Sequence, residues 1–452
     1  MAEERAKFGS KIGVILATAG SAVGLGNVWR FPYMTGENGG AAYIFIYIAC
    51  VIVLGIPCMI AEFLIGRHGA SNTARAYTRL ANGSKWKWIG YLEVLTGFLI
   101  TGYYAVVSGW CLNYVYASIM GELKGNPNYI KDYFVAFSTD PIRPIFWTVV
   151  IFLITHYIIV HGVRNGIEKA SKLMMPTLFI LLLIIVVAAC LLPGASAGIT
   201  FLLKPDFSKV TGDVFLNALG QCFYSMSIAM GCLCTYASYF NRKTNLTTSA
   251  IQIGFIDLFV AILAGLMIFP AAFSVGISPD SGPSLIFITL PNVFNQAFSG
   301  APVLGWIIAL LFYALLSLAA LTSLISLHEV NTAFFYEELH ISRKAGAWIV
   351  TLSCAVIGAV CSLSIGQKDT LSLFGKDLFD LFDFVTGQLM LPIGGMLMCV
   401  FVGWVVPQQI VKDELTNWGT LRYHCYSAFV FSMRYVCPLG ILAIMLHQFN
   451  LI

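Results

Sequence analysis

Glycines and polar residues interrupt the first apolar stretch of the chain, at Gly20, Gly24, Gly26, Asn27 and Arg30. Each glycine costs a helix about 1 kcal/mol relative to alanine. In a membrane, an unwound backbone persists only where protein or a water-filled cavity satisfies its N–H and C=O groups. We therefore predict a helix broken at mid-depth, which offers carbonyls to a cation and a helix N-terminus to an anion. The alternative is a tilted helix with a small-residue packing face, although Asn and Arg are costly at that depth.

The composition indicates a polytopic membrane protein. Of the 452 residues, 58% are hydrophobic and only 11% are charged, whereas about 25% are charged in a soluble domain. The 12 cysteines lie mostly in apolar segments without zinc-type spacing, so we expect unpaired, buried thiols. The basic start followed by an apolar run could imitate a secretory signal, but many more apolar segments follow it.

Apolar stretches of ~17–25 residues mark membrane spans. We predict an all-α membrane protein with eleven transmembrane helices. They lie near residues 12–36, 41–66, 88–119, 145–162, 167–191, 214–239, 247–275, 302–336, 345–364, 378–405 and 424–449. The segment 282–299 is apolar but short and split by Pro291. We expect it to form a re-entrant or capping hairpin over the outer mouth.

Charge distribution and symmetry give the orientation and a candidate site. Most Lys and Arg residues fall in the connections that lie inside if the N-terminus is cytoplasmic, which predicts that orientation and places the C-terminus outside. The sixth span carries Ser225, Ser227 and Gly231 near its middle. If spans one to five and six to ten are inverted repeats, the first and sixth correspond. Paired interrupted spans indicate a midplane site in a secondary transporter.

Sequence motifs along nearly the whole chain resemble the neurotransmitter:sodium symporter family. They are AGSAVGLGNVWRFPY at 19–33, ENGGAA at 37–42, IPCMIAEFLIGR at 56–67, GYYAVVSGW at 102–110, CTYASYF at 234–240, FITLPNVF at 287–294, LAALTSLIS at 318–326 and MRYVCP at 433–438. Family members commonly have one span more, so the chain looks like the bacterial subgroup of hydrophobic amino-acid transporters.

The resemblance implies a leucine-transporter-like fold, a 5+5 inverted repeat with broken helices 1 and 6. We expect one transporter core over residues 1–400, with repeats at about 12–191 and 214–405, and a loop and eleventh helix over 406–452.

The resemblance also implies two sodium sites, with oxygen ligands as hard cations require. The first would use the Ala22 carbonyl, the side chains of Asn27, Ser225 and Asp257, and the carboxylate of the substrate. Because that ligand is shared, substrate and sodium would each raise the affinity of the other. The second would use the carbonyls of Gly20, Val23 and Ala319 and the hydroxyls of Thr322 and Ser323. Ordinary hydrogen bonding back to the helix is the alternative for these two hydroxyls.

Asp257 replaces the Asn that many family members carry beside a required chloride. The carboxylate would supply the negative charge itself, and Ala261, one turn later, adds none. We therefore expect chloride-independent transport, with Asp257 as a candidate for moving a proton in the opposite direction. A purely structural ion pair is the alternative.

Gly24 stands where the monoamine branch of the family carries an aspartate, so the substrate must bring its own carboxylate, as an amino acid does. That carboxylate would meet the N–H groups of Leu25 and Gly26 at a helix N-terminus and the hydroxyl of Tyr104. The amine would lie near Ser225 and Ser227. The side chain would contact Ile100, Tyr224, Met230, Ser323 and Leu327. Met230 is deformable and Gly102 would add room, which predicts a tolerant pocket for large apolar and aromatic side chains. Any of these apolar positions could instead be ordinary core.

Further residues match gates and supports of the family. Arg30 and Asp383 match the outer charge pair, with Tyr104 and Tyr224 as an aromatic lid. Arg5 and Glu337 match the inner pair, with Phe8 nearby, and Glu338 could exchange roles with Glu337. Glu62 is expected to hold the unwound part of the sixth span. Gly166 and Pro176 would let the fifth span unwind so that water reaches the second sodium site. His156 and His161 do not share a helix face, which argues against a metal pair.

The leading hypothesis is a sodium-coupled symporter of neutral hydrophobic and aromatic L-amino acids in the inner (plasma) membrane, working by alternating access. The alternatives are a narrower substrate, such as an osmolyte or one aromatic amino acid, or a non-transporting sensor with the same fold. Neither an oxyanion arrangement nor a metal motif supports an enzyme. The sequence shows no P-loop, so ions must drive uptake. We expect sodium as the cofactor, no organic cofactor, an amino acid and the lipid bilayer as partners, and no nucleic acid.

Overall fold

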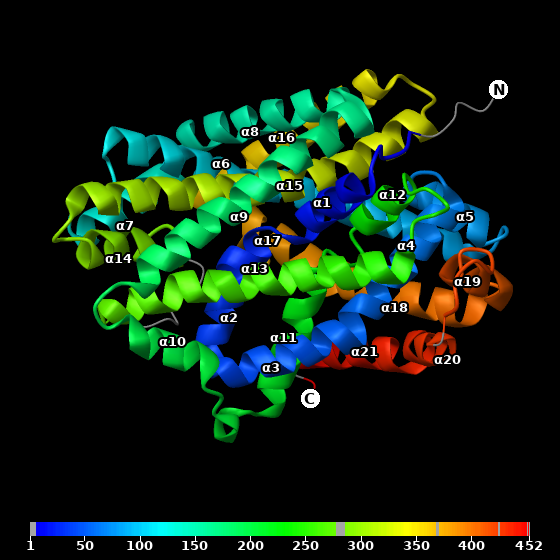
Figure 1. Cartoon of the computed structure of the whole chain (residues 1–452). Helices are drawn as coiled ribbons and strands as arrows, with labels where there is room; N and C mark the ends of the chain where they lie inside the picture. Colours follow the sequence, from blue (N-terminus) through cyan, green and yellow to red (C-terminus); the bar gives the residue numbers. More distant parts are fainter. Residues whose placement is uncertain (1–5, 277–284, 368–369, 424, 450, 452) are drawn as a thin grey trace.

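Long apolar segments form a bundle of helices in the computed structural model, which describes residues 6–276, 285–367, 370–423, 425–449 and 451 (Figure 1). Helices are expected here because a spanning segment must satisfy its own backbone N–H and C=O groups. Within the described residues, the only strands are β1 (Ser372–Leu373) and β2 (Lys376–Asp377), a short antiparallel pair.

The helices are α1 (Lys11–Ala22), α2 (Phe31–Glu37), α3 (Ala41–Cys50), α4 (Ile56–Gly69), α5 (Thr73–Leu80), α6 (Trp88–Met120), α7 (Pro127–Ser138), α8 (Arg143–Val160), α9 (Lys169–Cys190), α10 (Ala195–Leu203), α11 (Gly212–Ser225), α12 (Cys232–Ala237), α13 (Leu246–Ser274), α14 (Thr289–Ala297), α15 (Pro302–Glu338), α16 (Arg343–Gly366), α17 (Leu378–Phe384), α18 (Leu391–Val400), α19 (Gln408–Leu415), α20 (Tyr426–Phe431) and α21 (Cys437–Gln448). Short π-helical segments are η1 (Gly26–Arg30), η2 (Val51–Gly55), η4 (Val163–Glu168), η7 (Val385–Met390), η8 (Phe401–Val405) and η9 (Ser432–Val436). Short 3-10 helices are η3 (Lys85–Lys87) and η5 (Phe207–Lys209).

The predicted spans agree closely with these helices. In the described part of the chain, 9 helical runs are long and apolar enough to cross a membrane, and a tenth forms when α1 is joined to η1 and α2 across a 52° bend. The predicted sixth span corresponds to α11 and α12, each too short to cross alone. The predicted all-α membrane fold is therefore confirmed.

Two spans are interrupted, as the glycines and serines predicted. The first helix stops at Ala22 and resumes as η1 at Gly26. The second break separates Ser225 from Cys232, and its backbone has positive φ at Ser227 (54°), Ala229 (63°) and Gly231 (73°). Positive φ is unfavourable for residues with a side chain, so this conformation needs support from its surroundings.

Helices α6 and α15, with 33 and 37 residues, form the centre of the bundle. They pack against each other and against α8 and α16, while α1 packs on α15, α9 and α13. On the opposite side, α18 packs on α21 and on α4. Figure 1 shows these helices running in roughly one direction, with the broken segments between them.

Several connecting helices were not predicted. α5 and α7 begin at the caps Asn72 and Asn126, whose side chains accept from Arg75 N and Tyr129 N. These caps are ordinary helix-start signals. The predicted hairpin at 282–299 lies partly outside the described residues. Its described remainder forms α14, and Pro291 falls in the first turn, where proline removes no helical hydrogen bond.

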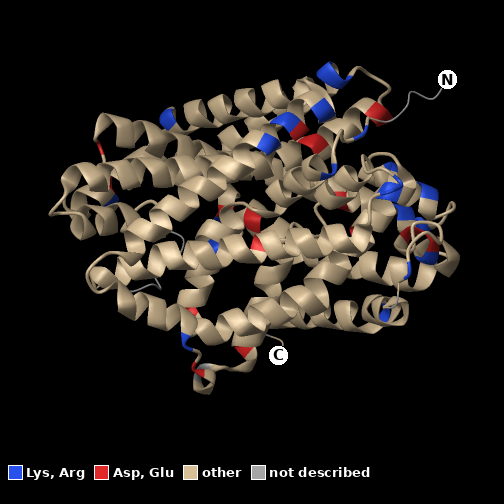
Figure 2. Ribbon diagram, viewed as in Figure 1, with Lys and Arg blue, Asp and Glu red and all other residues tan. Residues whose placement is uncertain are grey.

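Charged side chains are unevenly placed along the bundle. Figure 2 shows many of the Lys and Arg positions at the end that carries α5 and α19, and few near α7 and α14. This distribution is typical of a membrane protein whose basic end is cytoplasmic.

A candidate substrate and sodium site between two broken helices

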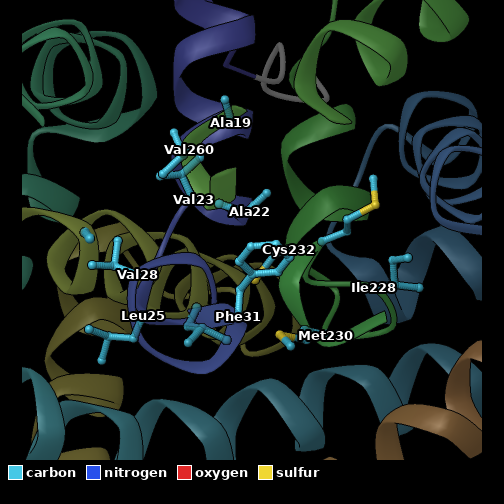
Figure 3. Packing of buried hydrophobic residues seen from close by; sticks show 14 of the residues in the cluster. Ala19, Ala22, Val23, Leu25, Val28, Phe31, Ile228, Met230, Cys232 and Val260 are labelled. Carbon is cyan, nitrogen blue, oxygen red and sulfur yellow. The ribbon is translucent and has the colours of Figure 1, made fainter. Parts of the chain in front are cut away.

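A cavity of about 40 Å³ lies between the two helix breaks. It is lined by every residue predicted to contact substrate and also by Ser21, Gly24 and Cys232. The lining residues are Ser21, Ala22, Gly24, Leu25, Gly26, Ile100, Tyr104, Tyr224, Ser225, Ser227, Met230, Cys232, Ser323 and Leu327. None of these side chains carries a charge. Figure 3 shows residues of both breaks in one buried cluster, among them Ala22 and Leu25 of the first and Ile228 and Met230 of the second.

A buried carboxylate ties both breaks together beside this cavity. Asp257 of α13 is fully buried, and its Oδ1 accepts from Asn27 Nδ2 at 2.7 Å and from Ser225 Oγ at 3.1 Å. Tyr47 donates to Oδ2 at 3.3 Å. The Asn27 side chain also accepts from Gly24 N at 3.0 Å. The structure thus brings together the three side chains proposed for the first sodium site.

The residues of the predicted second site also meet. Thr322 Oγ1 lies 3.3 Å from the carbonyl of Val23 and 2.9 Å from that of Ala319. A Cβ built on Gly20 would lie 3.4 Å from Thr322 Cβ, so that glycine is adjacent. The Ser323 hydroxyl faces Ser21 O at 3.4 Å. The bond to Ala319 is the back-bonding named above as the alternative, whereas the bond to Val23 reaches the other helix.

Gly24 leaves no room for a side chain, because an added Cβ would collide with Ser323 Oγ. Leu25 N lies 3.5 Å from the Tyr104 hydroxyl, which places this N–H group and this phenol at the same end of the cavity.

Gly102 does not enlarge the pocket as expected, and this prediction is wrong. A Cβ there would collide with Ile357 of α16, so Gly102 serves helix packing instead.

Glu62 supports the second break from α4. Its carboxylate is fully buried and accepts from Ala229 N at 2.6 Å and from Cys234 N at 3.3 Å. Both N–H groups lie where the helix is interrupted or restarts. A buried N–H group without a partner is costly, so this one side chain supports the break by satisfying two of its backbone N–H groups.

A larger cavity of about 280 Å³ adjoins the first on the side of Arg30 and Asp383, both of which line it. The two cavities share Tyr104 and Tyr224 in their linings. Within the described residues, Arg30 and Asp383 form no ion pair with each other. Arg30 lies over the Tyr224 ring at 4.5 Å, and Asp383 accepts from Tyr103 at 3.1 Å.

At the opposite end, Glu337 accepts from Asn72 N at 2.8 Å and from the Tyr336 hydroxyl at 3.0 Å. Its predicted partner Arg5 lies outside the described residues. Glu338 pairs with Arg75 at 3.0 Å. Phe8 is buried and makes edge contacts with the rings of Tyr236 and Tyr239. The N-terminal segment therefore packs under the restarted helix α12.

Comparison with known proteins decides what this arrangement belongs to. The model of the sodium:neurotransmitter symporter family matches residues 5–130 and 128–451. The chain belongs to this family. The resemblance drawn from the motifs is confirmed, and the relatives below are described as transporters rather than enzymes.

The chain is 34% identical over the full length of both proteins to the uncharacterized sodium-dependent transporter YhdH of Bacillus subtilis (strain 168). It is 35% identical to an uncharacterized sodium-dependent transporter of Haemophilus influenzae, covering 99% of this chain and 98% of the relative. Among solved structures, the crystal structure of MhsT in complex with L-phenylalanine matches with a TM-score of 0.88 and 38% identity, covering 98% of this chain and 99% of that one.

The fifth span of this family member is continuous from Val163 to Cys190. Gly166 lies in η4, where a Cβ would collide with the Ile158 carbonyl, and Pro176 lies inside α9. Glu168, between them, accepts from Gly9 N at 2.6 Å and Ser10 Oγ at 2.8 Å. The predicted unwinding segment is thus fully helical in this structure and is joined to the N-terminal segment.

Sequence reasoning missed Tyr47, Glu168 and Cys232. Tyr47 lies in an apolar helix and Cys232 among other cysteines, so nothing in their surroundings marks them. Glu168 could have been noticed as an acidic residue beside Gly166. His156 and His161 bond to Thr351 Oγ1 and to Tyr157 O, respectively, and do not meet.

Proposed function

We propose that this chain is a sodium-coupled symporter of neutral hydrophobic and aromatic L-amino acids that works by alternating access and needs no chloride. The observation that carries the proposal is the placement of an uncharged cavity between two helix breaks, directly beside the Asn27–Ser225–Asp257 cluster. One small space thus offers apolar contacts for a side chain and oxygen atoms for a cation.

Sodium would bind at the two predicted places. Asn27, Ser225 and Asp257, with the Ala22 carbonyl and the substrate carboxylate, would form the first site. Gly20, Val23, Ala319, Thr322 and Ser323 would form the second. In the first, the substrate carboxylate completes the coordination of the cation, so each ligand strengthens binding of the other. This shared ligand is the physical basis of symport.

Asp257 supplies the negative charge that this site needs. A relative at 24% identity over 96% of this chain and 81% of its own length is the human sodium- and chloride-dependent GABA transporter 2. Because a fixed carboxylate already lies within hydrogen-bond distance of Asn27 and Ser225, a chloride ion has no charge left to balance here. The same carboxylate is the candidate group for a counter-transported proton.

The substrate would lie with its carboxylate at Leu25, Gly26 and Tyr104 and its amine toward Ser225 and Ser227. Its side chain would contact Ile100, Tyr224, Met230, Ser323 and Leu327. The structural relative MhsT was crystallised with L-phenylalanine, which supports an aromatic amino acid. Met230 lets the pocket adapt to other apolar side chains.

Two gates would control access. Arg30 and Asp383 line the larger cavity without touching, an arrangement that suits an open outer gate. Surface ion pairs contribute only ~0–1 kcal/mol, so such a gate can open and close readily.

The inner gate would comprise Arg5 and Glu337, with Glu62 holding the second break and Gly166 and Pro176 permitting α9 to unwind. The two inverted repeats would move against each other, with the N-terminus in the cytoplasm and the C-terminus outside the plasma membrane.

The test is uptake of labelled leucine, phenylalanine and tryptophan into proteoliposomes, with and without an inward sodium gradient, and with chloride replaced by gluconate. We expect accumulation that requires sodium, survives gluconate and is reduced by several large apolar amino acids. Accumulation of a single amino acid would support a narrow carrier. Sodium-dependent binding without accumulation would indicate a sensor, and loss of uptake in gluconate would contradict chloride independence.

A further inference from the structure

Three cysteine thiols from three different helices meet in the interior, and none of the three lines the substrate cavity. Cys58 of α4, Cys399 of α18 and Cys437 of α21 are each 0% exposed. Their sulfur atoms all lie within 4.8 Å of one another, and the Cys58 and Cys399 sulfurs are 3.6 Å apart. All 12 cysteines are free thiols, so these three remain available to bind a metal ion.

The spacing of these sulfurs suits a three-coordinate metal ion. Metal–sulfur bonds of about 2.3 Å place the three sulfurs of a trigonal site about 4.0 Å apart. Small shifts of the side chains would bring the three Sγ atoms to this separation. The Ser432 hydroxyl, 3.2 Å from Cys437 Sγ, is placed to hydrogen-bond a ligand sulfur, as outer groups do in protein metal sites.

We propose that Cys58, Cys399 and Cys437 form a binding site for one soft, thiophilic metal ion of the Cu(I) type. Thiolate ligands select soft ions and disfavour sodium, which prefers oxygen. Structural zinc takes four ligands, and in the described part of the chain no His, Asp or Glu side chain joins the three sulfurs. A monovalent ion that accepts three sulfurs fits this donor set better. The thiol protons displaced on binding pass to bulk solution.

An ion in this site would link α4, α18 and α21 through three metal–sulfur bonds. Cys58 lies one helical turn before Glu62, the residue that holds the second break. Immobilising this face of α4 restrains the helix that supports the substrate cavity. We therefore expect metal occupancy to slow transport, a consequence that rests on the proposed function, whereas the binding itself does not.

The experiment titrates the reduced, purified full-length protein with Cu(I) under anaerobic conditions against a competing chelator. Cys425 is exposed, so all measurements use a Cys425→Ala background to remove that thiol. The variants are Cys58→Ala, Cys399→Ala and Cys437→Ala. The matched control is Cys111→Ala, which removes a thiol that is also 0% exposed but lies in α6.

The background protein and the Cys111→Ala control should bind about one Cu(I) per chain, with X-ray absorption showing sulfur ligation. Each cluster variant should bind at least about tenfold more weakly. Metal-free thermal unfolding verifies that each variant is folded, and an alanine variant that is not folded is replaced by the serine variant at the same position. Copper should slow uptake by the background protein and not by Cys399→Ala. Binding that is absent from the background protein, or unchanged in all three cluster variants, would overturn the proposal.

Discussion

The side-chain amide of Asn27 donates to the carboxylate of Asp257 across 2.7 Å. Both side chains are fully buried, and Ser225 bonds to the same carboxylate oxygen. One acidic group thus joins the first helix break, the second break and α13. The amide N–H atoms face Asp257 and Ser225, so in the proposed sodium site Asn27 would have to turn its oxygen toward the cation.

Replacing Asp257 with Asn should strongly weaken sodium binding. The substitution keeps the shape of the side chain and removes the negative charge beside the proposed cation, where burial strengthens electrostatic attraction. We expect the sodium concentration for half-maximal uptake to rise about tenfold or more, equivalent to about 1.4 kcal/mol. Chloride should partly restore uptake. The measurement is uptake against sodium concentration in chloride and in gluconate.

Asp213→Asn is the control, because Asp213 is 74% exposed and pairs with His447, and neither residue lines either cavity. It should leave the sodium dependence unchanged. An Asp257→Asn variant with native sodium dependence in gluconate would show that this carboxylate does not hold the cation.

Adding one methyl group at Gly24 should impair substrate binding. A Cβ there would collide with Ser323 Oγ, and overpacking of a tight site typically costs 1–3 kcal/mol. We expect Gly24→Ala to raise the KM for leucine roughly tenfold, since 1.4 kcal/mol is a factor of ten. Gly212→Ala is the control, because a Cβ there would meet no atom within 4 Å and Gly212 lines neither cavity. Equal effects of the two substitutions would argue against the Ser323 collision.

The fold could be predicted from the sequence because length and hydropathy mark most spans directly. α13 was expected at 247–275 and is observed at Leu246–Ser274. The connecting helices α5 and α10 were missed because they are short, with 8 and 9 residues. The bend between α1 and η1 was foreseen from Gly20, Gly24 and Gly26, since glycine weakens a helix.

The lining of the cavity could be predicted through family motifs, whereas its supporting contacts could not. Tyr47 and Asp257 are separated by 210 positions in the sequence yet share a hydrogen bond. Gly102 faces Ile357 rather than the pocket because the rotation of α6 about its axis is set by its packing on α16. Such contacts depend on how helices are turned, and hydropathy carries no information about that.

Glu62→Gln should slow transport severely while leaving a folded protein. The carboxylate accepts from both Ala229 N and Cys234 N, but an amide has one acceptor oxygen and would turn N–H groups toward one of these donors. We expect at least about tenfold slower uptake, because an unsatisfied buried donor costs about 1–3 kcal/mol. Glu93→Gln is the control. Glu93 is also fully buried, but one of its oxygens accepts from Tyr77 and the other has no hydrogen-bond partner among the residues that the structure describes, so Glu93→Gln should retain most activity. Full activity of Glu62→Gln would contradict the supporting role.

Removing the Glu168 side chain should release the N-terminal segment. Glu168 accepts from Gly9 N and Ser10 Oγ and pairs with Lys172 at 2.7 Å. In Glu168→Ala, we expect faster amide hydrogen exchange at residues 6–13, because local opening becomes easier. Lys172→Ala removes only the partly exposed partner and should leave that exchange nearly unchanged. If both variants exchange at the native rate, Glu168 does not fasten this segment.

Pro176→Ala should slow the release of sodium to the inside. Pro176 lies within α9 and removes a helical hydrogen bond there, a loss that in helix interiors costs about 3 kcal/mol. Alanine restores the bond and stabilises the wound helix, so the unwinding that would expose the second sodium site becomes rarer. The measurement is single-turnover uptake together with sodium efflux from loaded vesicles. Pro270→Ala is the control, because that proline also lies inside a membrane-spanning helix but in α13. We expect slower turnover with unchanged substrate affinity in Pro176→Ala, and a native turnover rate in this variant would argue against unwinding of α9 as the exit route.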